Sequence, residues 1–502
     1  MNTVIFSTKN LHIQFIEKLR LKRGVMKLLR KFILLCSAFI VIAGIISPER
    51  AFGITVQQEK ELSREFMKVV LKHYEFIKDP LIVNYVNDIG NKIISVLPPQ
   101  PFTYRFYVIK EDVYNAFASP AGHIFINSGL LEAMENEEEL AGIIAHEIAH
   151  VVCRHISQKI ERSKKIGIAT LAGIAAGIFL GAGGAATAAN AVTFGSIAVG
   201  QSIALAYSRE DETQADQIGL DCLARAGYNC KGLLSVLTKI RSKQWFGPDQ
   251  IPTYLKTHPA LEERMAFIDT RLEKNEKTAG KIDPYNFERA HTRLVAVHGD
   301  ESMALKKFES DVRNHPANSL AHYGYGLVLA KTGNRKDAAA HLKTALKKRA
   351  FDPYILKDLG LIYFLDGRYQ EALLVLEGAS SITSDDPESL FYLGRTQMEL
   401  GRLKDAAVTF EELISKNSDY IQALYSLGET YNKLGRLGDA HYCLGIYYKK
   451  KANLKSAAFH LKRALENMGD PDKKAKIEEM LKEIRKEESL MRMHESTKVR
   501  KR

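Results

Sequence analysis

The run 135-ENEEELAGIIAHEIAHVV-152 decides how the first half of this chain folds. Acidic residues crowd its start, apolar residues fill the rest, and no Gly or Pro follows Gly142, so the pattern predicts a buried helix. His146 and His150 are four residues apart and project from the same face of that helix. Two imidazoles placed in this way bind one zinc ion. Glu147 is displaced around the helix, where its carboxylate can act as a general base toward water.

A catalytic zinc site needs a third protein ligand and an open fourth position. The segment 208-SREDETQADQIG-219 offers a ligand on a second predicted helix. Glu212 can bind the metal, while Asp216, four residues on and on the same face, accepts the outer N–H of a ligand histidine. Glu210 and Asp211 remain alternative ligands by residue type. The structural alternatives are two buried histidines without a metal and an acidic helix start in water.

Residues Asn115–Gly219 resemble the HtpX-like zinc metallopeptidases, in which a helix with HExxH is followed by a second helix with ExxxD. This sequence matches the pattern at His146, Glu147, His150, Glu212 and Asp216. The resemblance implies a gluzincin-type α+β metalloprotease domain with one Zn²⁺ per chain. It assigns three metal ligands, His146, His150 and Glu212, with Glu147 as the catalytic residue and Asp216 as support.

The stretch Asn115–Leu131 is similar to the strand pair that precedes the metal helix in this family. We expect an edge strand there, which would hold an extended substrate by main-chain hydrogen bonds. Its residues are Gly122, His123, Ile124, Phe125 and Ile126. The alternative is a hairpin that serves only as scaffold.

Two more histidines lie near these motifs. His258 precedes Pro259 in a predicted loop, from which it can approach the open zinc position. There it would be a gate, as a restraining fourth ligand, or a donor to the developing oxyanion, and the family's Thr-His-Pro segment favours such a role over a structural one. His155 is expected to cap or pack at the far end of the metal helix without chemistry.

The second half of the chain repeats with a period of 34 residues. Small residues recur at Gly326, Gly360, Gly394 and Gly428, at Gly333, Gly367, Gly401 and Gly435, and at Ala338, Ala372, Ala406 and Ala440. The pattern resembles the tetratricopeptide repeat over residues 286–466. Each unit buries its apolar face only against its neighbours, so we expect an α-solenoid with a groove for a protein partner, the alternative being a passive spacer. The spacing halves after Ala440, so one helix at residues 438–450 serves two repeats.

Residues 1–53 differ in charge from the rest of the chain. They carry nine Lys and Arg against two Glu, which is +7 of the net +12. From Met26, a possible true start, a basic stretch, an apolar run at 32–46 and small residues before Ile54 are typical of a secretory signal peptide. An uncleaved membrane anchor is the alternative. No basic stripe interleaved with aromatics appears, which argues against nucleic-acid binding.

Residues 166–204 are rich in Ala and Gly and lie between the two metal motifs. We expect a partly helical lid or a hairpin with peripheral membrane contact, and a pair of membrane spans is the alternative. A secreted protein can form disulfides. Cys222 and Cys230 flank a predicted helix end, so the chain could bring them together, and the sequence does not decide whether they form a disulfide. Cys153 is expected to be a buried thiol.

The sequence thus predicts a mainly α fold with a small β-sheet. The expected order is leader 1–53, metalloprotease domain 54–275, linker 276–285, repeat array 286–466 and a charged, solvated helical tail 467–502. This combination resembles the β-barrel assembly-enhancing proteases of Gram-negative envelopes. The resemblance implies a periplasmic endopeptidase for unfolded or misassembled outer-membrane proteins, with assembly machinery as the partner of the repeats. The alternative is a chaperone or assembly adaptor in which proteolysis is secondary.

Overall fold

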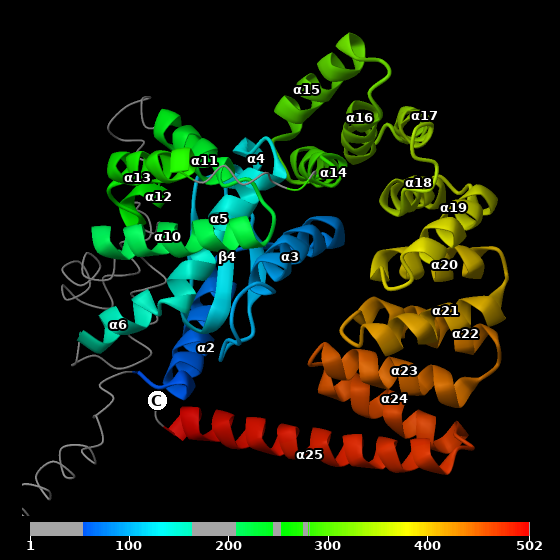
Figure 1. Ribbon diagram of the computed structural model, residues 1–502. Coiled ribbons are helices and arrows are strands. Elements are labelled where there is room, and N and C mark those ends of the chain that lie inside the picture. Colours follow the sequence, from blue (N-terminus) through cyan, green and yellow to red (C-terminus); the bar gives the residue numbers. More distant parts are fainter. Residues whose placement is uncertain (1–53, 163–206, 244–252, 275–279, 281, 501–502) are drawn as a thin grey trace, which may run out of the picture.

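The computed structural model describes residues 54–162, 207–243, 253–274, 280 and 282–500. Helices surround a small sheet in the first part of the chain, and successive helical pairs curve away from it in the second (Figure 1). The predicted fold class, mainly α with a small sheet followed by an α-solenoid, is confirmed. The leader 1–53, the segment 166–204 and half of the predicted linker fall outside the described residues.

The sheet has four strands in the order β1-β2-β4-β3. They are β1 (Phe76–Ile77), β2 (Arg105–Ile109), β3 (Ala116–Ala118) and β4 (His123–Asn127). β2 and β4 are parallel, and the other two pairs are antiparallel. Aromatic rings cover one face, where Phe125 stacks on Tyr107 and on Phe117. The sheet therefore lies within the protein core.

The expectation of an edge strand at residues 122–126 is wrong. β4 is an interior strand, with Ile124 beside Phe106 of β2 on one side and opposite Ala118 of β3 on the other. Ile124, Phe125 and Ile126 are all 0% exposed. A continuous apolar run is typical of a strand covered on both faces, and strand order depends on contacts distant in sequence. The sheet edge next to β4 belongs to β3 instead.

The metal-motif helix α5 (Glu137–Val152) is buried along most of its length. Asn136 caps it by accepting a hydrogen bond from the N–H of Glu139, and three acidic residues in its first turn favour the helix N-terminus. α10 (Arg209–Arg225) crosses it closely at Gly219, where a Cβ would lie 3.3 Å from the carbonyl carbon of Ala145. The second motif helix is thereby held against the first.

The remaining helices of the first part surround α5. α3 (Pro80–Ile94) and α11 (Lys231–Lys243) pack directly on it. The others are α2 (Val56–His73), α4 (Ser128–Ala133), α6 (His155–Arg162), α12 (Thr253–Thr257) and α13 (Leu261–Lys274). The apolar residues of α4, α12 and α13 join the core around α5, whereas those of α2 and α6 form a second cluster on the aromatic face of the sheet.

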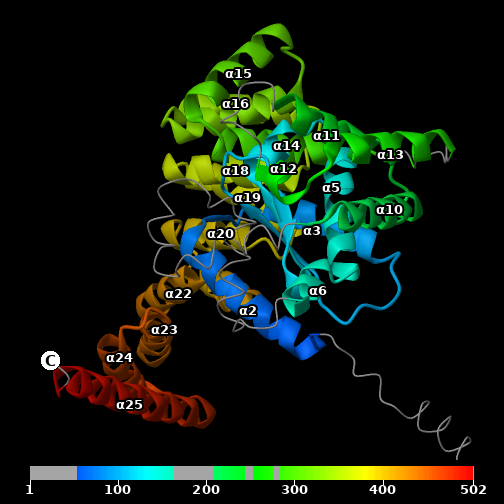
Figure 2. The ribbon, with the colours of Figure 1, turned by 90° about the vertical axis from the view of Figure 1, so that its left-hand side faces the viewer.

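The repeat array consists of paired helices that follow α14 (Tyr285–Arg293), a π-helix (Leu294–His298) and α15 (Glu301–Asn314). The helices are α16 (Ser319–Lys331), α17 (Arg335–Leu346), α18 (Pro353–Leu365), α19 (Tyr369–Ile382), α20 (Pro387–Glu399), α21 (Leu403–Lys416), α22 (Ile421–Lys433), α23 (Leu437–Lys450), α24 (Leu454–Asn467) and α25 (Pro471–Arg500). The far end of the array, α24 and α25, lies well away from α5 and α10 in both views (Figures 1 and 2).

The repeated glycines let the two helices of a pair touch. A Cβ on Gly360 would lie 2.5 Å from Leu376, and one on Gly394 would lie 2.7 Å from Phe410. α23 takes part in two such contacts, because Leu444 covers Gly428 of α22 while Leu461 of α24 covers Gly445. One helix thus serves two repeats, as the halved spacing predicts.

A buried cation joins the array to the first part of the chain. Arg293, at the end of α14, pairs with Asp79 at 2.5 Å and with Asp358 of α18 at 2.5 Å, and it donates to the hydroxyl of Tyr323 at 2.9 Å. Asp79 is the N-cap of α3, which itself packs on α5. The first repeats are therefore docked against the part of the chain that carries the metal motif.

The predicted solvated tail is partly core. Ile477, Leu481 and Ile484 of α25 are at most 5% exposed and pack on α24. Their spacing of four and three residues puts them on one helix face, which the high charge of the tail conceals. Within the described residues, no helix combines the length and apolar character that a membrane span needs.

The cysteines of the described part are free thiols, so the pairing that the sequence left open is absent there. Cys222 is buried on α10, whereas the Cys230 thiol faces the carbonyl oxygen of Leu220 at 3.5 Å. Burial raises the pKa of the Cys222 thiol and of the Cys153 thiol, the latter to about 11. These thiols are therefore protonated near neutral pH.

Candidate metal centre

Four side chains from three parts of the chain converge on one point. His146 and His150 come from α5, Glu212 from α10 and His258 from the residue after α12, and one ligand atom of each lies within 4.8 Å of the others. The two Nε2 atoms of His146 and His150 are 3.0 Å apart. All four side chains are at most 2% exposed. The structure thus brings together the three proposed ligands and the proposed gate.

His258 reaches the cluster because α12 ends beside it. Its N–H donates to the carbonyl of Tyr254 at 2.8 Å, and the two rings stack with centroids 4.2 Å apart. Its Nδ1 lies 3.1 Å from Glu212 Oε1 and 3.4 Å from His146 Nε2. His258 therefore stands where a fourth ligand would stand.

Glu147 is also buried in this site, and neither of its oxygens has a hydrogen-bond partner among the described residues. His258 Nε2 lies 3.5 Å from Oε1. Burial raises the pKa of the Glu147 carboxyl above its usual range. Burying a carboxylate without hydrogen-bond partners costs free energy. This indicates that a ligand or water lies beside Glu147 in the functional state.

Asp216 and Arg264 support the cluster from behind. Asp216 accepts from Nδ1 of His146 at 2.8 Å, which leaves Nε2 of that ring to face the cluster. Arg264 of α13 donates two hydrogen bonds to Asp216, from Nε and from Nη2, each at 2.8 Å. Its Nη1 forms an ion pair with Glu212 Oε2 at 2.7 Å. One guanidinium thus orients a proposed ligand and the carboxylate that supports another.

These contacts set the charges of the site. Burial alone would raise the pKa of both carboxyls. His258 and Arg264 instead hold the pKa of Glu212 well below its usual range. Arg264 lowers the pKa of Asp216 to about 2. Burial would also lower the pKa of His146, yet Asp216 raises it to about 9. Burial lowers the pKa of His150. Both carboxylates are therefore ionised at neutral pH.

Sequence reasoning missed Arg264. It follows His258 by six residues on a helix whose neighbours Glu262 and Glu263 are exposed, so no local pattern marks it as buried. The available signal was indirect, since two buried carboxylates on one face of α10 require a cation.

His155 lies closer to the site than predicted. Arg154 takes a left-handed conformation (φ 54°) directly after α5, and the chain turns so that His155 Nδ1 lies 2.8 Å from Nδ1 of His150. His155 packs at the end of the metal helix, as predicted, and it also contacts the ring of a proposed ligand. The rival ligands remain outside the cluster, since Glu210 is exposed and Asp211 pairs with Lys159 at 2.9 Å.

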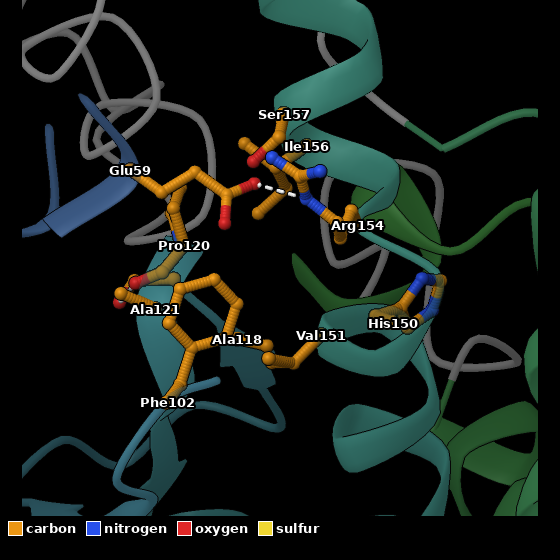
Figure 3. Close-up of a pocket in the computed structure, with 11 residues that line it drawn as sticks. Glu59, Phe102, Ala118, Pro120, Ala121, His150, Val151, Arg154, Ile156 and Ser157 are labelled. Atoms are coloured by element: carbon orange, nitrogen blue, oxygen red, sulfur yellow. Dashed lines mark hydrogen bonds and ion pairs between the residues drawn. The ribbon is translucent and has the colours of Figure 1, made fainter. Parts of the chain in front are cut away.

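A small pocket lies beside the C-terminal end of α5 (Figure 3). Its walls include Phe102, Ala118 at the end of β3, and Val151. Glu59 of α2 is paired there with Arg154 at 2.8 Å, so the first helix is tied to the turn that follows the metal helix. His150 lines the pocket but its ring belongs to the cluster.

The donor set fits a metal ion. Three imidazoles and one carboxylate converge with their ligand atoms close together, and the outer nitrogens of His146 and His150 already have hydrogen-bond partners. Nitrogen and oxygen donors in this number are what a tetrahedral divalent site requires. The described residues contain one such group of three or more potential ligands.

Two segments of the chain match known protein families. Residues 83–272 match Peptidase family M48. Tetratricopeptide repeats match residues 302–353, 328–387 and 363–426.

Curated relatives are similar over part of the chain. The putative beta-barrel assembly-enhancing protease of Vibrio cholerae is 28% identical over 312 residues, 61% of this chain and 63% of that protein. The beta-barrel assembly-enhancing protease of Escherichia coli K12 is 25% identical over 320 residues, 62% of each chain. The mitochondrial metalloendopeptidase OMA1 of Schizosaccharomyces pombe is 25% identical over 248 residues, 48% of this chain and 69% of that protein. The match spans less than two thirds of the length of the two bacterial relatives.

Proposed function

We propose that this chain, which carries a Peptidase family M48 domain together with tetratricopeptide repeats, is a zinc-dependent endopeptidase. The observation that supports the proposal most directly is the buried cluster of His146, His150 and Glu212. Beside it lies a carboxylate, Glu147, that has no hydrogen-bond partner in the described part of the chain. Zinc is the metal that this mixture of imidazole and carboxylate ligands favours.

The residues divide the chemistry of peptide hydrolysis among them. Bound zinc would lower the pKa of water and polarise the scissile carbonyl. Glu147 takes the proton from the attacking water and returns it to the leaving amine nitrogen, and its raised pKa suits both transfers. Asp216 keeps the proton of His146 on Nδ1. Arg264 holds Glu212 and Asp216 in place.

Metal removal tests the proposal. We expect about one zinc ion per chain, cleavage of unfolded casein by the purified protein, loss of cleavage with a chelator and recovery with added zinc. The His146→Ala variant should lose both metal and cleavage. Metal analysis and digestion of labelled casein measure these results. Cleavage that persists in chelator, with no metal in the protein, would contradict the proposal.

His258 is proposed as a gate, because its ring stands in the fourth ligand position and so competes with water and substrate. His258→Ala should therefore raise the initial rate of casein cleavage while zinc stays bound through the other three ligands. If His258 instead donates to the oxyanion, the rate falls, by about 10²–10³-fold for loss of one donor. Rates measured at equal zinc content distinguish the two roles.

The cellular role is proposed from the relatives. Because the matches to beta-barrel assembly-enhancing proteases cover 61% and 62% of this chain, we propose that this protein lies in the periplasm and that unfolded or misassembled outer-membrane proteins are its substrates. The repeats would bind a protein partner, such as assembly machinery. If an extended substrate pairs with the sheet near the metal centre, it does so at β3 rather than β4.

A further inference from the structure

We infer that His155 and Gln214 form a positioning relay that points the lone pair of His150 at the metal. This inference rests on the proposed metal site and concerns two residues outside its ligand set. His150 Nδ1 lies 2.8 Å from His155 Nδ1, and His155 Nε2 lies 3.0 Å from Oε1 of Gln214. The three side chains therefore form one line of hydrogen bonds that runs from the cluster to the protein surface.

The direction of these hydrogen bonds follows from the donors available. The side-chain oxygen of Gln214 can only accept, so Nε2 of His155 carries a proton and donates. A neutral imidazole has one N–H, so Nδ1 of His155 accepts, and the proton between the rings belongs to His150 Nδ1. His150 Nε2 is then unprotonated, and its lone pair is free to bind a metal.

The reverse direction would disable the ligand. A donor at position 214 would make His155 Nε2 an acceptor and put the ring proton on Nδ1. His155 would then donate to His150, whose own proton would move to Nε2 and face the cluster. The hydrogen-bonding character of residue 214 therefore determines whether His150 is ready to bind.

The two ligand histidines differ in the group that contacts the outer nitrogen, Nδ1. Among the described residues, His150 Nδ1 faces His155, whereas a carboxylate faces the same atom of His146. His146 has Asp216 at 2.8 Å. The carboxylate beyond His150 is Asp211, which stands 3.8 Å from His155 Nε2 and is engaged by Lys159 at 2.9 Å and by the N–H of Ser208 at 2.9 Å. An imidazole thus lies beside His150 where a carboxylate lies beside His146, and the amide oxygen of Gln214 contacts the far side of that imidazole.

The chain permits a clean test because Gln214 is exposed while His155 is 1% exposed. Gln214→Glu keeps an acceptor and Gln214→Lys offers only a donor, and both changes sit on the surface of α10. Gln217 is exposed on the same helix, three residues further along, so Gln217→Glu and Gln217→Lys carry the same charge changes as controls.

Zinc affinity, measured by competition with a fluorescent chelator at neutral pH, is the readout. Gln214→Lys should weaken zinc binding about 10-fold or more relative to Gln217→Lys, as loss of an outer-shell partner does. Gln214→Glu should bind at least as tightly as the unchanged protein. Nitrogen NMR of the metal-free protein should show the proton of His150 on Nδ1 in the unchanged chain.

Equal shifts for the 214 and 217 variants would show a charge effect only and would overturn the relay, while the proposed function stands. A second pair addresses His155 itself, since His155→Gln restores an acceptor and His155→Leu does not. The relay is overturned if these two bind zinc equally. A wild-type chain that binds no zinc overturns both the relay and the proposed function.

Discussion

Glu147→Gln is expected to leave zinc bound and to lower the turnover of unfolded casein by about 10²–10⁴-fold, the usual contribution of a general base. The amide has nearly the same shape as the carboxylate but cannot take a proton from water. The exchange removes a buried charge whose oxygens have no hydrogen-bond partner in the structure, so folding should not suffer. The three proposed ligands are unchanged.

The control for this variant is Glu138→Gln, the same exchange in the first turn of the same helix, far from the cluster in sequence and partly exposed. It should cleave at the wild-type rate. Turnover is measured at matched zinc content. An active Glu147→Gln variant would show that another group accepts the proton, and the catalytic assignment would be wrong.

The same variant separates proteolysis from an adaptor role. Expressed in a bacterium that lacks its own copy, Glu147→Gln should fail to restore the envelope barrier if cleavage is the main task. Full rescue would favour a chaperone or adaptor built on the repeats.

Arg264→Leu is expected to destabilise the metal-free protein by about 3–5 kcal/mol, the typical cost of removing one partner from a buried ion pair. Arg264 is 2% exposed and is the cation shared by Glu212 and Asp216. Its loss leaves two buried carboxylates facing each other beside His146. Zinc affinity should fall as well, because Glu212 and Asp216 lose the group that orients them.

Arg271→Leu, seven residues further along α13, provides the matched control. Arg271 pairs with Asp221 of α10 at 2.8 Å, but both side chains are substantially exposed, so about 0–1 kcal/mol is expected. Urea unfolding in the presence of chelator gives both values. Equal destabilisation by the two variants would mean that the buried arginine has no special part in the site.

The features that sequence analysis predicted depend on local spacing. His146 with His150, and Glu212 with Asp216, share helix faces because four residues make about one turn. The glycines at 34-residue intervals likewise report the helix contacts of each repeat. These relations hold wherever the helix lies in the fold, so the proposed ligands could be named before the structure was known.

What could not be predicted depends on chain segments that meet only after folding. β4 lies inside the sheet because it pairs with β2 on one side and with β3 on the other, and the pairing with β2 joins strands that are separated in sequence by β3. Arg264 reaches Asp216 across 48 residues. His155 comes back to His150 through the left-handed turn at Arg154. No periodicity within a segment encodes these contacts.

The complete burial of the metal cluster has a consequence for how the protein is switched on. Glu147, Glu212 and His258 are 0% exposed, so a polypeptide cannot reach them in the conformation seen here. In the proposed peptidase, cleavage would proceed from another conformer, and the observed rate would be the intrinsic rate multiplied by the fraction of molecules in that conformer. A partner on the repeats that binds this conformer more tightly raises the rate by enlarging the fraction. Control of the proposed peptidase would then depend on the populations of two conformers, and an effector would not need to contact the metal cluster.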